Sequence, residues 1–314
     1  MRLDGAPVPE APGEVRACLA VRDEALRLPS CLDHHRRLGV DRFLIVDNGS
    51  IDGTLDYLAA QPDVCLFHTT ESFSAARAGL AWTNAMRDAF CEGHWTLSID
   101  ADELFIFPGY ERVGLRALCD HLDGAGAELL LALLLDLYGP GGLDEATHVP
   151  GADLIETCPF FDPGPYSYLR VGSFPHVQFT GGVRDRIFDF RRYQPRPPVI
   201  SKAPLARWRR GMAYTMSTHA VTPGRVYPAL AVLLHFKFLS DFRERVRLAI
   251  ERGQHYGGSQ EYRAYQDVLR QAGDLRLANE QSVRFEGSAQ LLRLRLMQTD
   301  VAYDAFLAGQ TAAE

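Results

Sequence analysis

Short apolar runs alternate with amphipathic segments from residue 15 onward, and this alternation constrains the fold more than any other feature of the chain. Runs of strand length that are rich in β-branched and aromatic residues, separated by segments with helical spacing, indicate βα units and a mainly parallel sheet. The expected strands are residues 16–21, 43–46, 64–67, 95–99, 129–135 and 231–238. The expected helices are residues 29–38, 54–60, 73–91, 111–121, 241–252 with Ser240 as its cap, and most of 260–307. The sequence therefore predicts an α/β fold with helices on a parallel sheet.

Composition excludes several other classes of protein. Of 314 residues, 46% are hydrophobic and 23% are charged, which are ordinary globular values. The net charge of -7 argues against a nucleic-acid partner held by a general basic field, although arginines gather between residues 191 and 210. The six cysteines are widely spaced without a Cys-x-x-Cys pair, so we expect reduced, mostly buried thiols.

We expect neither a secretory signal nor a membrane-spanning helix in this sequence. Residues 1–14 lack the basic and apolar tandem of a secretory signal, and no apolar run approaches the roughly 20 residues of a spanning helix. We expect a cytoplasmic protein, with peripheral contact with the inner face of the membrane left open.

An acidic cluster, Asp100-Ala101-Asp102-Glu103, follows the strand expected at residues 95–99. Side chains alternate along extended backbone, so Asp100 and Asp102 point to the same side. Open α/β sheets place ligands at the carboxyl ends of their strands. Such a pair can hold Mg²⁺ or Mn²⁺, which in turn holds phosphates. The alternative is a chance Asp-x-Asp that serves as a turn or a helix cap.

A second polar cluster, Asp47-Asn48-Gly49-Ser50, follows the strand expected at residues 43–46. Acidic and amide side chains at this position can bind a nucleotide base or ribose. A turn followed by an N-cap, with Ser50 or Asp52 as the capping residue, explains the same residues and can hold at the same time. The segment is not a dinucleotide fingerprint, because no Gly-x-Gly-x-x-Gly follows the first strand.

Together these segments resemble a family 2 glycosyltransferase of the bacterial branch. The resemblance is carried by residues 20–24, residues 46–54, Arg77, and the acidic cluster at 100–103, in that order and spacing. It is strong over residues 15–107 and weaker over 181–262. Asp23 stands where that branch commonly has Asn.

The resemblance implies a GT-A fold, a nucleotide-diphosphate sugar donor with a UDP-sugar favoured, and an inverting transfer. It implies that Asp47 and Asn48 contact the base or ribose, while Arg22 and Arg77 help to position the nucleotide. Asp102 becomes the expected direct ligand of Mn²⁺ or Mg²⁺, and Asp100 a second ligand or a contact to ribose or metal-bound water. Glu103 is expected to be structural.

Two residues near the end of the strand expected at 231–238 extend this site. GT-A enzymes of several families bring a C-terminal histidine to the metal, so the resemblance makes His235 a third metal ligand. A core histidine is the alternative. Lys237 lies on the same face of the strand and could contact the diphosphate. His219 competes with His235 for the metal.

An inverting transfer needs a general base near the acceptor hydroxyl, and a carboxylate is the usual choice. We assign this role to Asp185, with Glu103 and Glu156 as alternatives. Arg184 and Arg186 flank Asp185 and could form ion pairs with it, which would lower its pKa and weaken it as a base.

The chain divides into an extension at 1–14, a nucleotide-sugar-binding half at 15–138, an acceptor-side half with long loops at 139–240, and a helical region at 241–314. The expected acceptor is a saccharide or lipid-linked saccharide, in cell-surface polysaccharide or glycoconjugate synthesis. Aromatic and arginine side chains within 160–208 could line its site. The last helices could cover the sheet, form a homodimer or rest on a membrane.

Two other functions remain open. A non-catalytic nucleotide-sugar-binding protein would keep the same fold. A phosphotransferase of the haloacid dehalogenase type also uses Asp-x-Asp, but on its first strand rather than the fourth.

Overall fold

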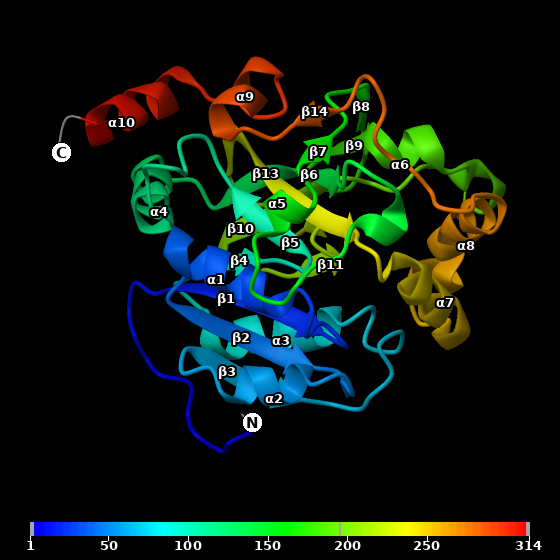
Figure 1. The fold of residues 1–314 in the computed structure, drawn as a ribbon. Coiled ribbons are helices and arrows are strands. Elements are labelled where there is room, and N and C mark those ends of the chain that lie inside the picture. The colour runs from blue at the N-terminus through cyan, green and yellow to red at the C-terminus, as the bar shows by residue number, and fades with distance from the viewer. Residues whose placement is uncertain (1–2, 195, 312–314) are drawn as a thin grey trace.

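The computed structural model describes residues 3–194 and 196–311. The first two residues of the expected extension and the last three of the expected helical region lie outside these ranges. A ten-stranded sheet with helices packed around it forms the centre of the described part (Figure 1). The predicted α/β class is confirmed.

Four parallel strands make up the N-terminal half of the sheet, in the order β4, β1, β2, β3. Their bounds are Val15–Val21 for β1, Arg42–Asp47 for β2, Val64–His68 for β3 and Trp95–Ser98 for β4. The connecting helices are α1 Leu28–Leu38, α2 Thr54–Ala59 and α3 Leu80–Phe90. The expected strands of this half are confirmed to within one or two residues.

The other half of the sheet is mixed. Strand β10 (Ser201–Arg207) lies between β4 and β6 (Leu129–Tyr138) and is antiparallel to both. Strand β13 (Val226–Phe238) is parallel to β6 and antiparallel to β5 (Glu103–Ile106). Consequently β1, β2, β3, β4, β6 and β13 run in one direction, and their carboxyl ends share one edge of the sheet.

Further elements surround this frame. The other strands are β7 Phe160–Phe161, β8 Tyr166–Arg170, β9 Val177–Gly181, β11 Tyr214–Met216, β12 Ala220–Val221 and β14 Val283–Arg284. The other helices are α4 Leu115–Gly124, α5 Leu154–Thr157, α6 Gly182–Ile187, α7 Phe242–Arg252, α8 Tyr256–Gln271, α9 Ser288–Arg293 and α10 Val301–Thr311. Short 3-10 turns span Leu143–Glu145 and Phe190–Arg192.

Both faces of the sheet are buried, as its nearly continuous apolar strands require. In β1, Ala17 and Leu19 pack into one core cluster while Cys18 packs into another, because successive side chains point to opposite faces. A third cluster of aromatic residues, including Phe188, Phe238 and Tyr265, joins α7 and α8 to α6 and to the end of β13. Figure 1 shows α7 and α8 beside the carboxyl end of β13.

Several expected elements differ from the structure. Helix α3 begins at Leu80 rather than at residue 73, because Arg77, Ala78 and Gly79 have positive φ angles and so lie outside the right-handed helical region. Arg77 therefore lies in a turn before the helix. Ser240 does not cap α7: the N-cap is Asp241, whose side chain binds Arg27 instead.

Three further outcomes concern the whole chain. In the C-terminal region, helices α7 to α10 are separated by non-helical residues 253–255, 272–287 and 294–300, and the short strand β14 lies in the second of these segments. All six cysteines are free and buried, as expected. In the described part of the chain, no helix has the length and apolarity needed to cross a membrane.

Candidate metal and nucleotide site

The polar residues singled out in the sequence gather at the shared carboxyl edge of the parallel strands. Asp47 is the last residue of β2, and Asp102 follows β4. Asp136 and His235 lie opposite each other in the parallel pair β6 and β13, near the ends of both strands. The Phe236 N–H donates to the Asp102 carbonyl oxygen at 2.8 Å, which places the His235 ring beside the acidic cluster.

His235 lies between two carboxylates. Its Nε2 is 3.3 Å from Asp102 Oδ2, and its Nδ1 is 2.6 Å from Asp136 Oδ1. Asp136 also accepts two hydrogen bonds from Arg184, from Nε at 2.7 Å and from Nη2 at 3.0 Å. All four residues are at most 9% exposed.

The charges of this group depend on one another. Burial alone would raise the pKa of Asp102, but the adjacent His235 holds that pKa well below its usual value. Burial likewise would raise the pKa of Asp136, but Arg184 and His235 lower it. Burial disfavours a charged His235, yet the Asp102 and Asp136 carboxylates raise its pKa. The group therefore has two carboxylates that require positive charge between them.

The spacing of Asp102 and His235 fits a divalent metal. A protonated His235 can donate from Nδ1 to Asp136 and from Nε2 to Asp102. Once Nε2 has lost its proton, its lone pair faces a carboxylate oxygen at 3.3 Å, and a cation between the two acceptors replaces that proton. Two donors at right angles around Mg²⁺, each at about 2.1 Å, lie about 3.0 Å apart, which is close to the observed separation.

The protein supplies only part of a coordination sphere. Across residues 3–194 and 196–311, no group of three or more His, Cys, Asp or Glu side chains is arranged to hold a metal ion. Two protein donors leave most positions of an octahedral ion for phosphate oxygens and water, which is how Mg²⁺ is commonly bound beside nucleotides.

Asp100 has a different partner from Asp102. The Nζ of Lys202, on β10, lies 3.0 Å from Asp100 Oδ2 and also donates to Glu103. The Asp100 side chain is 59% exposed, whereas those of Lys202 and Glu103 are 4% and 1% exposed. Burial raises the pKa of Glu103 to about 7. The pKa of Lys202 is also raised, because the carboxylates of Asp100 and Glu103 outweigh the effect of burial. Glu103 is thus a buried ion-pair partner, as the structural role expected for it requires.

Lys237 lies two residues beyond His235 on the same strand. Its Nζ is 3.4 Å from Glu261 Oε1 on α8 and sits over the rings of Tyr262 and Tyr265. Glu261 Oε1 is also 3.6 Å from Arg184 Nη1. The C-terminal helix α8 therefore contributes a carboxylate to this edge of the sheet.

Asp47 and Asn48 are buried and incompletely hydrogen-bonded. Asp47 Oδ2 accepts from the Ser50 N–H and lies 3.1 Å from His68 Nδ1, and the Asn48 amide donates to the Thr69 and Glu71 carbonyls. Within the described structure, Asp47 Oδ1 and Asn48 Oδ1 have no hydrogen-bond partner. Buried acceptors are rarely left unpaired, and these two lie at the carboxyl end of β2.

The first loop is fixed to helix α7. Asp23 Oδ2 pairs with Arg252 at 2.9 Å, and Glu24 is bound by two nitrogens of Arg245 at 2.7 and 2.8 Å. Arg22 is 38% exposed and 3.7 Å from Asp23, while Arg77 is exposed and donates to the Thr215 carbonyl at 3.0 Å. Arg22 and Arg77 thus retain exposed guanidinium groups.

Two of the candidates for the general base, Asp185 and Glu156, are exposed side chains. Asp185 is exposed on α6, and its neighbours Arg184 and Arg186 direct their guanidinium groups to Asp136 and Asp162 instead. Glu156 is 70% exposed and pairs with Arg284.

In the described structure, no hydrogen bond or ion pair joins His219 to His235, Asp102 or Asp136. The Nδ1 of His219 is 2.8 Å from the Ser201 carbonyl oxygen, and burial lowers the pKa of His219 to about 4.

Sequence reasoning missed three residues of the site: Asp136, Arg184 as its partner, and Lys202. Asp136 had a visible signal, because it is the single charged residue in the apolar stretch Leu129–Tyr138. Lys202 had a weaker one, a lysine followed by the small and apolar residues 203–206 of its strand.

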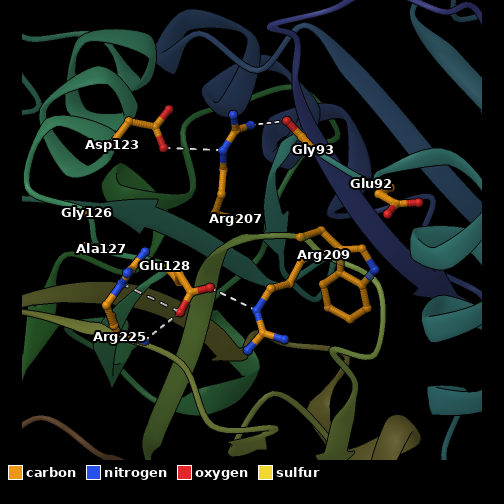
Figure 2. Close-up of a pocket in the computed structure, with 10 residues that line it drawn as sticks. Glu92, Gly93, Asp123, Gly126, Ala127, Glu128, Arg207, Arg209 and Arg225 are labelled. Atoms are coloured by element: carbon orange, nitrogen blue, oxygen red, sulfur yellow. Dashed lines mark hydrogen bonds and ion pairs between the residues drawn. The ribbon is translucent and has the colours of Figure 1, made fainter.

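A cavity of about 440 Å³ lies at the opposite edge of the sheet (Figure 2). Its walls come from residues just before β4, β6 and β13 and from the end of β10. Its arginines are already paired: Arg207 with Asp123 at 3.3 Å, and Arg209 and Arg225 with Glu128 at 2.9 and 3.9 Å. The cavity is therefore separate from the site and is balanced in charge.

Comparisons with known proteins find partial similarity. No protein-family model matches the chain. A stretch of 122 residues, 38% of this chain and 28% of the relative, is 37% identical to a TPR repeat-containing protein of Synechococcus elongatus. A stretch of 155 residues, 48% of this chain and 27% of the relative, is 28% identical to a glycosyltransferase family 92 protein of Ricinus communis. The chain thus spans less than a third of the length of these relatives.

Solved structures share the general arrangement only distantly. A putative glucose-1-phosphate thymidylyltransferase of Bacillus anthracis is 8% identical with a TM-score of 0.32, over 81% of this chain and 83% of that chain. A UTP-bound UGPase of Acinetobacter baumannii is 9% identical with a TM-score of 0.29, over 82% of this chain and 99% of that chain. Likeness at this level carries no argument about function.

Proposed function

We propose that this protein is a metal-dependent glycosyltransferase that takes a sugar from a nucleoside-diphosphate sugar, with a UDP-sugar as the favoured donor. The observation that carries the proposal is the opposition of Asp102 Oδ2 and His235 Nε2 at 3.3 Å, at the same sheet edge as the unpaired oxygens of Asp47 and Asn48. A divalent cation and a nucleoside would satisfy both needs at once. The partial similarity to a glycosyltransferase family 92 protein supports the same class.

Each residue then has a defined task. Asp102 and His235 hold Mn²⁺ or Mg²⁺, with Asp100 beside them to accept from ribose or metal-bound water. The bound ion would stabilise the charge that develops on the diphosphate leaving group. Asp47 and Asn48 accept hydrogen bonds from the base or ribose.

The cationic side chains and the acceptor complete the proposal. Lys237, Arg22 and Arg77 neutralise or position the diphosphate. The acceptor is a saccharide or lipid-linked saccharide, and the transfer is inverting. Asp185 takes the proton from the acceptor hydroxyl, since it is an exposed carboxylate next to Arg184, whose guanidinium contacts the His235 group.

A donor panel tests this function. UDP-, GDP- and dTDP-sugars are incubated with the protein and Mn²⁺, with and without chelator, and release of the nucleoside diphosphate is measured. We expect turnover that requires the metal and that Asp102→Asn abolishes. Asp120→Asn, an exposed carboxylate on α4, is the matched control and should keep full activity.

Saturable donor binding without turnover for any sugar would instead favour a non-catalytic nucleotide-sugar-binding protein. Full activity of Asp102→Asn would refute the metal assignment.

A further inference from the structure

Asp136 is a buried carboxylate that the proposed chemistry does not itself use. It is 5% exposed and lies in β6, the strand adjacent to β13. In the parallel register of these two strands it is directly opposite His235. Because β6 and β13 are hydrogen-bonded neighbours within the core, the position of Asp136 relative to His235 is set by the sheet and not by a loop.

The oxygens of Asp136 are already used. Oδ2 accepts from Arg184 Nε at 2.7 Å, while Oδ1 accepts from Arg184 Nη2 at 3.0 Å and lies 2.6 Å from His235 Nδ1. A bidentate arginine fixes the plane of a carboxylate as well as its position. Asp136 is therefore poorly placed to bind a metal directly, but well placed to hold one nitrogen of the imidazole ring.

Holding Nδ1 determines what the other nitrogen can do. In the neutral ring that a metal would bind, donation of the Nδ1 hydrogen to Asp136 leaves the lone pair on Nε2, the nitrogen that faces Asp102. Without this partner the ring could rotate or adopt the other tautomer, in which Nε2 carries a hydrogen and cannot bind a metal. Carboxylates in this position behind a histidine raise metal affinity in other metalloproteins.

We infer that Asp136, fixed by Arg184, is a positioning residue that directs His235 Nε2 toward a divalent cation shared with Asp102. The inference rests on the proposed metal site and adds the residues that orient its ligand. A purely structural role for Asp136, as the partner of a buried arginine, makes a different prediction for metal affinity.

The chain offers a matched control for this distinction. Asp162 is 4% exposed and is held by two nitrogens of Arg186, at 2.8 and 2.9 Å, with Tyr138 as its other partner in place of a histidine. Arg184 and Arg186 both come from α6. Asp162→Asn therefore removes a similar buried ion pair without altering a contact to His235.

Binding of Mn²⁺ alone is measured by electron paramagnetic resonance of the free ion, for the full chain and its variants. We expect saturable binding by the wild type, a dissociation constant raised about 10- to 100-fold in Asp136→Asn, and a change below about three-fold in Asp162→Asn. Equal effects of the two variants would overturn the positioning role while leaving metal-dependent transfer intact. Absence of Mn²⁺ binding by the wild type, both for the ion alone and in the presence of saturating UDP, would overturn both.

A second measurement needs no variant of Asp136, in case Asp136→Asn does not fold. The wild type is labelled with ¹⁵N-histidine and saturated with Mg²⁺, and the ring nitrogens of His235 are identified by their loss in His235→Gln. We expect the hydrogen on Nδ1 and none on Nε2. A hydrogen on Nε2 with an unprotonated Nδ1 would overturn the inference.

Discussion

Replacing Lys202 by methionine should strongly destabilise the protein, because one of its two partners is buried and the other is not. Glu103 is 1% exposed and would lose the only cation that contacts it in the described structure. Removing one member of a buried ion pair costs about 3–5 kcal/mol. Asp100, the other partner, is 59% exposed, so Asp100→Asn should cost less than about 1 kcal/mol.

The loss should also be recoverable. In the double variant Lys202→Met with Glu103→Gln, no buried charge is left unpaired. The amide oxygen of the new glutamine could still accept the hydrogen bond that the Asp100 N–H gives to the Glu103 side chain at 3.2 Å. Replacing both members of a buried pair is often neutral, so the double variant should regain most of the lost free energy of unfolding.

Urea unfolding followed by circular dichroism measures these changes as shifts of the midpoint at constant slope. Two results would refute the assignment of the loss to an unpaired Glu103. One is an equal decrease in the free energy of unfolding for Lys202→Met and Asp100→Asn, and the other is a double variant that is no more stable than Lys202→Met alone.

Three further predictions concern residues outside this pair. Burial holds the pKa of His35 well below its usual value, so below pH 6.5 the unfolded chain gains a proton that the folded chain does not. As the pH falls below 6.5, this residue should remove stability with a slope that approaches about 1.4 kcal/mol per pH unit. In urea unfolding, the dependence of stability on pH should therefore be less steep in His35→Gln than in the wild type by that amount. Asp185→Asn should slow sugar transfer about 10²- to 10⁴-fold, as for loss of a general base, without weakening Mn²⁺ binding. The control Asp189→Asn, at a nearby exposed carboxylate, should transfer sugar at the normal rate. Equal transfer rates for the two variants would exclude Asp185 as the base. Gly39→Ala should cost about 1–2 kcal/mol in thermal or urea unfolding, since Gly39 ends α1 with φ of 109°, and an unchanged midpoint would contradict this.

The N-terminal half of the fold could be predicted from the sequence because its information is local. Each strand from β1 to β4 is a compact apolar run, and Gly39 marks the end of α1. The acidic cluster and Asp47 were found for the same reason, since each directly follows such a run.

The remainder depends on contacts between distant residues. Strand β10 contains Pro204 and Lys202, both unusual in a central strand, and is accommodated by a shift of register between Lys202 and Leu205. Glu103 can start a buried strand only because Lys202 reaches it from 99 residues away. Arg77 lies before α3 rather than within it, in a left-handed turn at residues 77–79 that local helix propensity does not indicate.

The place of β10 in the sheet has a consequence for synthesis of the chain. One long side of β4 stays open after β4 itself is made, because its neighbour on that side comes more than 100 residues later. Unpaired strand edges recruit other strands, and long-range pairings form slowly. We therefore expect nascent chains that end before β10 to depend on chaperones and to be prone to aggregation, and the sheet to close only when both halves have left the ribosome.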